Sequence, residues 1–309
     1  MEENGTSGLL GVLGGGLLAF VQNIAMSFYN LGYAITHPGL WLDWSNSESI
    51  MRFVYYGASV ELLYVILTTV LILTALGMWR HSILWGMVRG LEGFSNGLGR
   101  FFAWAGLIMV LQQVLIVFTQ RIFARPDMSF GLGLTLSLDI SWWSEELKLY
   151  NAMIVVFCLA YTFVQGGHVR VDLLYSPASY RTKKMIDMVG SVIFMLPMAV
   201  LTWLYAWFFL WRHLIVPNPS ASENLDRLLN KARALRWNVE TIGFSPNGFT
   251  GYFLFKILIV LMCAMIFLQG VTFFWRSYLE WREGEESEGK YHDHDRIEQG
   301  EDAYDHAEF

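Results

Sequence analysis

The chain contains 309 residues, of which 54% are hydrophobic and only 16% are charged, whereas about 25% of residues are charged in soluble domains. Its apolar residues form blocks long enough to cross a bilayer, which takes about 20 residues. These features exclude a soluble domain and predict an all-α, polytopic integral membrane protein. The formal net charge of −6 comes largely from the tail after Glu280. This net charge identifies no binding partner. We expect the chain to contact membrane lipids and no nucleic acid.

Two hydrophobic segments come first. Residues 9–35 are the weaker candidate span, because glycines at 14–16 and the Gln22-Asn23 pair interrupt the apolar run. This segment either crosses the membrane or lies in its interface. Residues 52–79 predict a clear span with Glu61 inside it, where an ionisable side chain marks a polar helix contact or an ion pathway. The glycine- and serine-rich stretch up to Arg100 is interpreted as a cytoplasmic linker.

Four further spans bring the expected number of transmembrane helices to about six. They cover residues 101–123, 144–165, 185–211 and 252–275. Gln112-Gln113 in the first of these should form hydrogen bonds between helices. Ser144 is the expected N-cap of the next helix, where Glu145 and Glu146 complement the helix dipole.

The last two spans carry their own markers. Pro197 should kink the helix of residues 185–211 mildly, which membrane helices tolerate. Lys256 can extend toward the interface near the start of the final span. Between these two spans, leucines and alanines at helical spacing predict an amphipathic helix over residues 222–237, with Glu223 and Arg227 as an ion pair.

Basic residues predict the orientation of the chain in the membrane. Positive-inside counting puts three clusters on the cytoplasmic side: residues 80–100, residues 170–184 and the end of the last span. Both termini are then cytoplasmic. The basic residues in 222–237 argue the other way, but we assign them to the amphipathic helix. The acidic tail from Glu283 is expected to be disordered.

No constellation of catalytic, cofactor-binding or metal-binding residues is found, so we expect no enzyme. Haem in a helix bundle needs inward-facing histidines, and the histidines before the tail fall at or beyond helix ends. Cys158 and Cys263 lie inside apolar runs and are interpreted as small hydrophobic side chains. His292, His294 and His306 in the acidic tail are interpreted as solvated.

Several short motifs, in order along residues 100–278, resemble the small membrane subunit (DctQ type) of tripartite ATP-independent periplasmic (TRAP) transporters. The motifs are Glu146-Leu147, Ala160-Tyr161, His168-Val169-Arg170-Val171-Asp172, Leu196-Pro197, Ser245-Pro246-Asn247-Gly248, Lys256 and Gln269-Gly270. The run around Arg170, in a turn between two spans, is the most specific of them. Three features depart from the family pattern: the two N-terminal segments, the 222–237 insertion, and Gly248-Phe249-Thr250 in place of the usual Pro-Gly-Gly after the Asn.

The resemblance implies a function. In this family the small subunit braces a large membrane subunit, which takes up an organic acid with sodium, and a periplasmic binding protein delivers the substrate. The small subunit has no substrate site of its own. Candidate structural or subunit-interface residues here are Glu61, Glu145, Glu146, His168, Arg170, Asp172 and Lys256. The sequence does not identify the substrate.

The resemblance also predicts how the chain is divided. Residues 1–99 form an N-terminal extension, 100–280 a four-helix core with the 222–237 insertion, and 281–309 an acidic tail. The main alternative function is a membrane-anchor subunit of a respiratory oxidoreductase, and another is a small carrier that acts alone.

Overall fold

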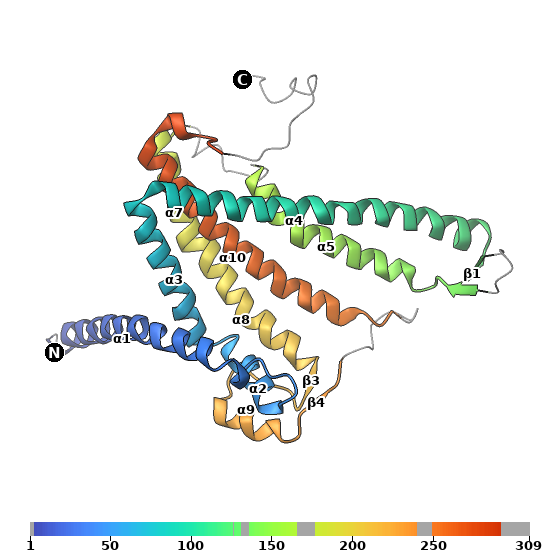
Figure 1. Cartoon of the computed structure of the whole chain (residues 1–309), viewed down its shortest axis with the longest axis horizontal. Helices are drawn as coiled ribbons and strands as arrows, with labels where there is room; N and C mark the ends of the chain where they lie inside the picture. Colours follow the sequence, from blue (N-terminus) through green and yellow to red (C-terminus); the bar gives the residue numbers. More distant parts are fainter. Residues whose placement is uncertain (1–2, 126, 131–135, 166–176, 240–248, 292–309) are drawn as a thin grey trace. The chain divides into compact units, whose positions relative to one another are not determined.

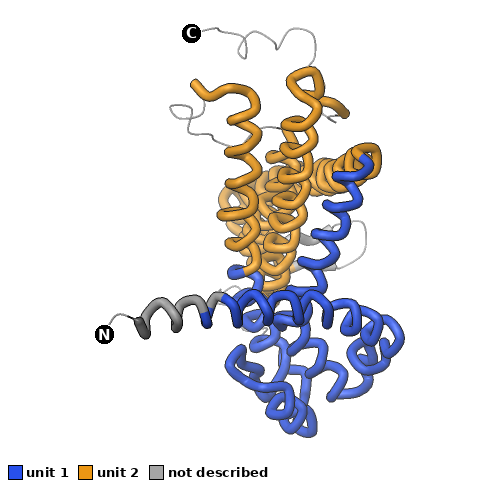
Figure 2. Tube along the Cα trace, turned by 90° about the vertical axis from the view of Figure 1, so that its left-hand side faces the viewer, with its two compact units in different colours: residues 1–80, 201–241 blue, residues 81–200, 242–309 orange. Residues whose placement is uncertain are grey.

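The computed structural model describes residues 3–125, 127–130, 136–165, 177–239 and 249–291. These residues are overwhelmingly helical, which confirms the predicted all-α fold (Figure 1). The chain divides into two compact units, Met1–Arg80 with Leu201–Thr241 and His81–Val200 with Ile242–Phe309 (Figure 2). Each unit is described separately below.

Five helices in the described part of the chain are long and apolar enough to cross a membrane. They are Val60–Trp79, His81–Ile122, Trp143–Val164, Tyr180–Arg212 and Tyr252–Glu283. The structure therefore confirms a polytopic membrane protein. The weakest predicted segment, residues 9–35, forms the single helix α1 (Glu3–Thr36), which is not among these five.

The first unit begins with α1 and η1 (Pro38–Leu40), followed by α2 (Ser47–Tyr56) and α3 (Val60–Trp79). α1 crosses α3 instead of running alongside it (Figures 1 and 2). At the crossing, the Ser27 hydroxyl donates to Thr68 Oγ1 at 2.9 Å, and both side chains are buried. Phe20 packs edge-on against Tyr64, with ring centroids 5.9 Å apart.

The predicted span over residues 52–79 is confirmed as α3, which ends at the predicted residue, but it begins later than predicted because the chain breaks between α2 and α3. The indole nitrogens of Trp203 and Trp207 donate to the carbonyls of Gly57 and Val54, each at 2.8 Å. A Cβ at Gly57 would lie 2.1 Å from the Trp207 ring, so only glycine fits this approach. Ser59 then caps α3 by accepting a hydrogen bond from Leu62 N at 3.2 Å.

The remainder of the first unit closes against α2. It consists of the end of α8 (Leu196–Arg212), the strand pair β3 (Ile215–Val216) and β4 (Arg236–Trp237), and α9 (Leu225–Ala232). Phe53 of α2 contacts the rings of Trp207 and Trp211, and Trp44 stacks on Trp237. Trp207 and Trp211 are the buried members of this aromatic cluster and belong to the core of the unit.

The predicted amphipathic helix over residues 222–237 is present but shorter. α9 ends at Ala232, and Arg236 and Trp237 pair with β3 as a strand instead of continuing the helix. Its apolar stripe is buried, since Leu228 and Ala232 are almost inaccessible and α9 packs against α2. Glu223 pairs with Lys231 at 2.5 Å and not with Arg227 as predicted.

The second unit is built on α4 (His81–Ile116), which continues through the π-helical turn η2 (Val117–Ile122). The predicted linker over residues 80–100 is therefore wrong. Its buried residues Leu84, Val88, Glu92 and Gly99 recur at helical spacing. Gly99 allows close packing against α5, because a Cβ there would lie 2.4 Å from Tyr161 Cβ. The 42-residue helix spans about 63 Å, so it extends beyond a hydrocarbon core of roughly 30 Å.

The other elements of this unit pack around α4. They are the hairpin β1 (Asp127–Phe130) and β2 (Leu136–Asp139), α5 (Trp143–Val164), α7 (Tyr180–Gly190), η3 (Ser191–Met195), the start of α8, α10 (Tyr252–Glu283) and η4 (Glu285–Ser287). α4 and α5 lie side by side (Figure 1). α5 matches its predicted bounds to within one residue at each end, although Trp142 and not Ser144 occupies the N-cap. α10 starts at the predicted residue and runs eight residues further than expected.

Pro197 follows a π-helical turn. Proline has no N–H to donate to the carbonyl one turn earlier, and η3 widens the helix over Ser191–Met195, just before it. The predicted span over residues 185–211 is part of this continuous helix, which begins at Tyr180 and ends at Arg212.

Candidate functional site

Two of the predicted residues lie in a polar cluster at the first turn of α5. Glu146 Oε2 accepts a hydrogen bond from Gln112 Nε2 of α4 at 2.8 Å, and its Oε1 accepts one from the Tyr150 hydroxyl at 3.0 Å. Gln112 is buried, whereas its neighbour Gln113 is exposed. The prediction that this glutamine pair links helices is thus confirmed for Gln112.

Glu145 extends the same cluster to a third helix. Its Oε2 lies 2.8 Å from Lys148 Nζ and accepts a hydrogen bond from the Tyr252 hydroxyl of α10 at 3.1 Å. Glu145 and Glu146 therefore connect α5 to α4 on one side and to α10 on the other. We call these contacts the α5 polar cluster.

A second cluster, which the sequence did not predict, contains four buried charged side chains. Glu92 of α4 pairs through both carboxylate oxygens with Arg276 of α10, with Oε1 2.5 Å from Arg276 Nε. Glu280, one turn further along α10, lies 3.5 Å from Arg276 and 2.7 Å from Lys184 Nζ of α7. All four are at most 8% exposed. This four-residue ion cluster joins α4, α7 and α10 with balanced charge.

The residues after α10 fold back over the ion cluster. Arg276 Nη1 donates to the carbonyl of Lys290 at 3.1 Å, and Lys184 also lies 3.3 Å from Glu288. Tyr291 packs edge-on against Trp85 of α4. The prediction of a disordered tail from Glu283 is therefore wrong up to Tyr291, because these contacts hold the segment in place. The rest of the tail, with its three histidines, lies outside the described residues.

The ion cluster had a sequence signal that could have revealed it. Glu92 lies on the same helical stripe as Leu84, Val88 and Gly99, and Arg276 and Glu280 are one turn apart on α10. Interpreting residues 80–100 as a linker concealed the stripe. The pairing of Glu92 with Arg276, 184 residues apart, has no local sequence signature.

The other predicted site residues belong to neither polar cluster in the described part of the chain. Glu61 is exposed in the first turn of α3 and not inside the apolar run as predicted. At this position its carboxylate complements the helix dipole. Lys256 is half-buried in the second turn of α10. The turn that contains His168, Arg170 and Asp172 lies outside the described residues.

No cluster in the described part of the chain has the composition of a metal site: none groups three or more His, Cys, Asp or Glu side chains in a suitable arrangement. Cys158 and Cys263 carry free thiols, and Cys263 is buried. Both polar clusters connect helices, and the ion cluster holds its four charges in pairs. Such an arrangement can hold the helices of a bundle together.

The five apolar helices with polar clusters between them define a multi-pass helical membrane protein. A comparison with protein families narrows this class. Residues 134–219 match the family described as tripartite ATP-independent periplasmic transporters, DctQ component. The matched region includes α5, α7 and α8 and is similar to the DctQ component of TRAP transporters. No curated protein and no solved structure matches the chain.

Proposed function

We propose that this chain is the small membrane subunit of a TRAP transporter in a bacterial inner membrane. It braces a large permease subunit that takes up an organic acid with sodium, and a periplasmic binding protein delivers the substrate. The match of residues 134–219 to the DctQ component carries this proposal.

The two polar clusters support a bracing role. The α5 polar cluster joins α4, α5 and α10, and the ion cluster joins α4, α7 and α10 at residues well separated from it along α4 and α10. Polar contacts at two separate levels resist sliding and splaying of helices, which apolar contacts alone resist weakly in lipid. A bundle held in this way can remain fixed while a neighbouring subunit moves.

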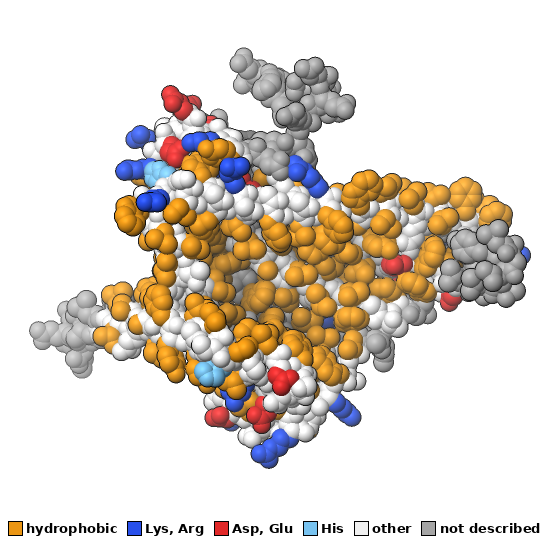
Figure 3. Space-filling view, viewed as in Figure 1, with side chains coloured by type: hydrophobic (Ala, Val, Ile, Leu, Met, Phe, Trp, Pro, Cys, Tyr) orange, Lys and Arg blue, Asp and Glu red, His pale blue; other side chains and the backbone are white. Residues whose placement is uncertain are grey.

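An apolar flank of α4 remains available for the large subunit or for lipid. Trp104 and Leu111 of α4 and Phe118 of η2 recur every seven residues and are each more than half exposed. Hydrophobic side chains cover the right-hand part of α4 and α5 in Figure 3. Such a surface is stable only against lipid tails or another membrane protein.

The proposed orientation has the C-terminus and the ion cluster on the cytoplasmic side. If α1 crossed the membrane as well, both termini would be cytoplasmic, as predicted. Because α1 crosses α3 and no Lys or Arg precedes Arg52, we propose instead that α1 lies along the periplasmic interface. A cysteine introduced at Thr6 should then react with a membrane-impermeant maleimide in intact spheroplasts. Labelling only after lysis would refute this placement.

Arg170 and Asp172 retain a proposed role on sequence grounds. A charge pair in a short turn between two spans can fix the angle between α5 and α7, either by local pairing or through the large subunit. Arg170→Ala should then lower the amount of large subunit that copurifies with the chain. Unchanged yield and uptake would show that the turn is only a solvated, positively charged loop.

The proposed function is tested by uptake in a strain that lacks this gene. Radiolabelled organic acids should no longer accumulate in a sodium-dependent manner, and the intact gene should restore accumulation. A variant truncated before α10 is the matched control, since it loses the ion cluster and the Tyr252 contact of the α5 polar cluster. Undiminished sodium-dependent uptake in the deletion strain would contradict the proposal.

A further inference from the structure

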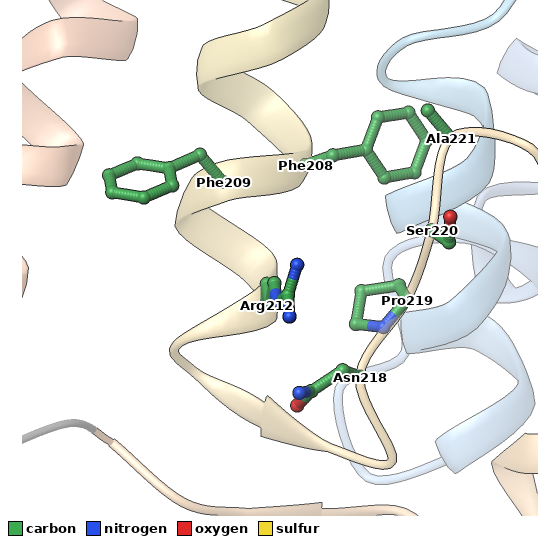
Figure 4. Close-up of a pocket in the computed structure, with 7 residues that line it drawn as sticks. All are labelled: Phe208, Phe209, Arg212, Asn218, Pro219, Ser220 and Ala221. Atoms are coloured by element: carbon green, nitrogen blue, oxygen red, sulfur yellow. The ribbon is translucent and has the colours of Figure 1, made fainter.

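A pocket of about 430 Å³ lies at the end of α8, within the first unit. Phe208, Phe209 and Arg212 line it from the last turns of α8, and residues 218–221 line it from the loop after β3. Figure 4 shows Arg212 between the helix and this loop, with Phe208 and Phe209 on the turn above. Both walls come from continuous stretches of the same unit.

The pocket is positively charged. Arg212 is the one charged residue among those that line it. The nearest acid in sequence, Glu223, is already held by Lys231 at 2.5 Å and by Ser220 N at 3.2 Å. In the described part of the chain, no side chain accepts a hydrogen bond from the Arg212 guanidinium.

The side-chain amide of Asn218, which also lines the pocket, donates its hydrogen bonds to backbone carbonyls. With its nitrogen turned toward the end of α8, Asn218 donates to the carbonyls of Arg212 and Ile215, at 3.1 and 3.2 Å. It thereby satisfies carbonyls that the end of a helix leaves unpaired. Arg212 is left as the principal group that an anion in this pocket would meet.

An exposed apolar stripe leads along α8 to Arg212. Leu201, Tyr205 and Phe209 follow one another at intervals of four residues and are 55%, 79% and 46% exposed. Side chains at this spacing share one helix face, and Arg212 continues that face three residues later. The stripe is about 12 Å long, at roughly 1.5 Å per residue.

We propose that this pocket binds the phosphate of an anionic phospholipid, whose acyl chain lies along the stripe. Guanidinium groups bind phosphate oxygens through paired hydrogen bonds, and the aromatic rings pack against the glycerol and the first methylenes. A soluble anion would gain nothing from the stripe. A zwitterionic lipid would place its ammonium group in a pocket that no carboxylate lines, so a net negative headgroup is favoured.

The test compares lipids with the same acyl chains on the purified full chain in detergent. Phosphatidylglycerol should raise the midpoint of thermal unfolding more than phosphatidylcholine does, because a ligand of the folded state stabilises it. Arg212→Gln should abolish the difference between the two lipids. The matched control, Arg227→Gln, removes an exposed charge from α9 and should preserve it. Glycerol 1-phosphate, which has the phosphate but no acyl chain, should give no shift at millimolar concentration.

Three results would overturn the proposal. They are an equal response to both lipids in the unmodified chain, a lipid difference that persists in Arg212→Gln, and a full response to glycerol 1-phosphate, which would indicate a site for a soluble anion. Should Arg212→Gln fail to fold, Ala221→Trp fills the pocket without changing charge and should also abolish the difference. Native mass spectrometry of the unmodified chain in an equimolar lipid mixture should show preferential retention of phosphatidylglycerol, and equal retention would contradict it.

Discussion

The strongest stability prediction concerns the pair formed by Glu92 and Arg276. These side chains are 3% and 4% exposed, and each carboxylate oxygen of Glu92 faces a nitrogen of Arg276. Glu92→Leu leaves the guanidinium with Glu280, at 3.5 Å, as its remaining carboxylate. Because removing one partner of a buried ion pair costs about 3–5 kcal/mol, we expect a loss of that size in the free energy of unfolding.

A double-mutant cycle separates the pair from its surroundings. Arg276→Met alone should also destabilise the chain, because it leaves Glu92 buried and unpaired. The double variant replaces the pair with two apolar side chains of similar size, which is often near neutral. We therefore expect the sum of the two single losses in the free energy of unfolding to exceed the loss in the double variant by at least about 2 kcal/mol.

The assay is reversible unfolding of the purified chain in mixed micelles with increasing mole fraction of dodecyl sulfate, followed by circular dichroism. Arg282→Gln is the matched control, since Arg282 lies on the same helix but is exposed; we expect less than about 0.5 kcal/mol for it. A Glu92→Leu loss as small as the control's would show that the first half of α4 does not pack on α10 as described.

Substitutions at three further positions test the other contacts. Gly57→Ala forces a Cβ against the Trp207 ring and should destabilise the chain by about 1–3 kcal/mol in the same assay; a neutral result would refute the close approach. Glu146→Leu leaves the buried Gln112 amide without its partner and should cost about 1–3 kcal/mol, whereas Glu146→Gln should cost less; equal losses would show that the hydrogen bond is unimportant. Leu228→Ala should cost about 2–5 kcal/mol and expose α9 to limited proteolysis, and an unchanged digestion pattern would contradict its burial.

Predictions from the sequence were most accurate where residues close together in the chain determine the structure. The long apolar run of α5, with two acids in its first turn, predicted that helix to within one residue at each end. Gln112 was correctly interpreted as a helix contact, because a buried amide in an apolar helix needs a hydrogen-bond partner. Neither inference requires knowledge of a distant segment.

The errors arose where a distant side chain determines the local structure. The break at Gly57 depends on two indole N–H groups from α8, about 150 residues later in the chain. Without these contacts the apolar run around it is indistinguishable from one continuous span. Likewise, the glycines after Arg80 suggested a loop, although tertiary packing against α5 stabilises a helix there.

The central claim is that this chain braces the large subunit of a TRAP transporter, and copurification tests it most directly. The chain, tagged at its C-terminus and expressed from its own locus, is purified in a mild detergent, and its partners are identified and quantified by mass spectrometry. We predict one partner in equimolar amount, a multi-span TRAP permease, and a marked loss of it when Glu92→Leu weakens the bundle. Recovery of respiratory oxidoreductase subunits with a haem absorbance band, or of the chain alone, would contradict the account.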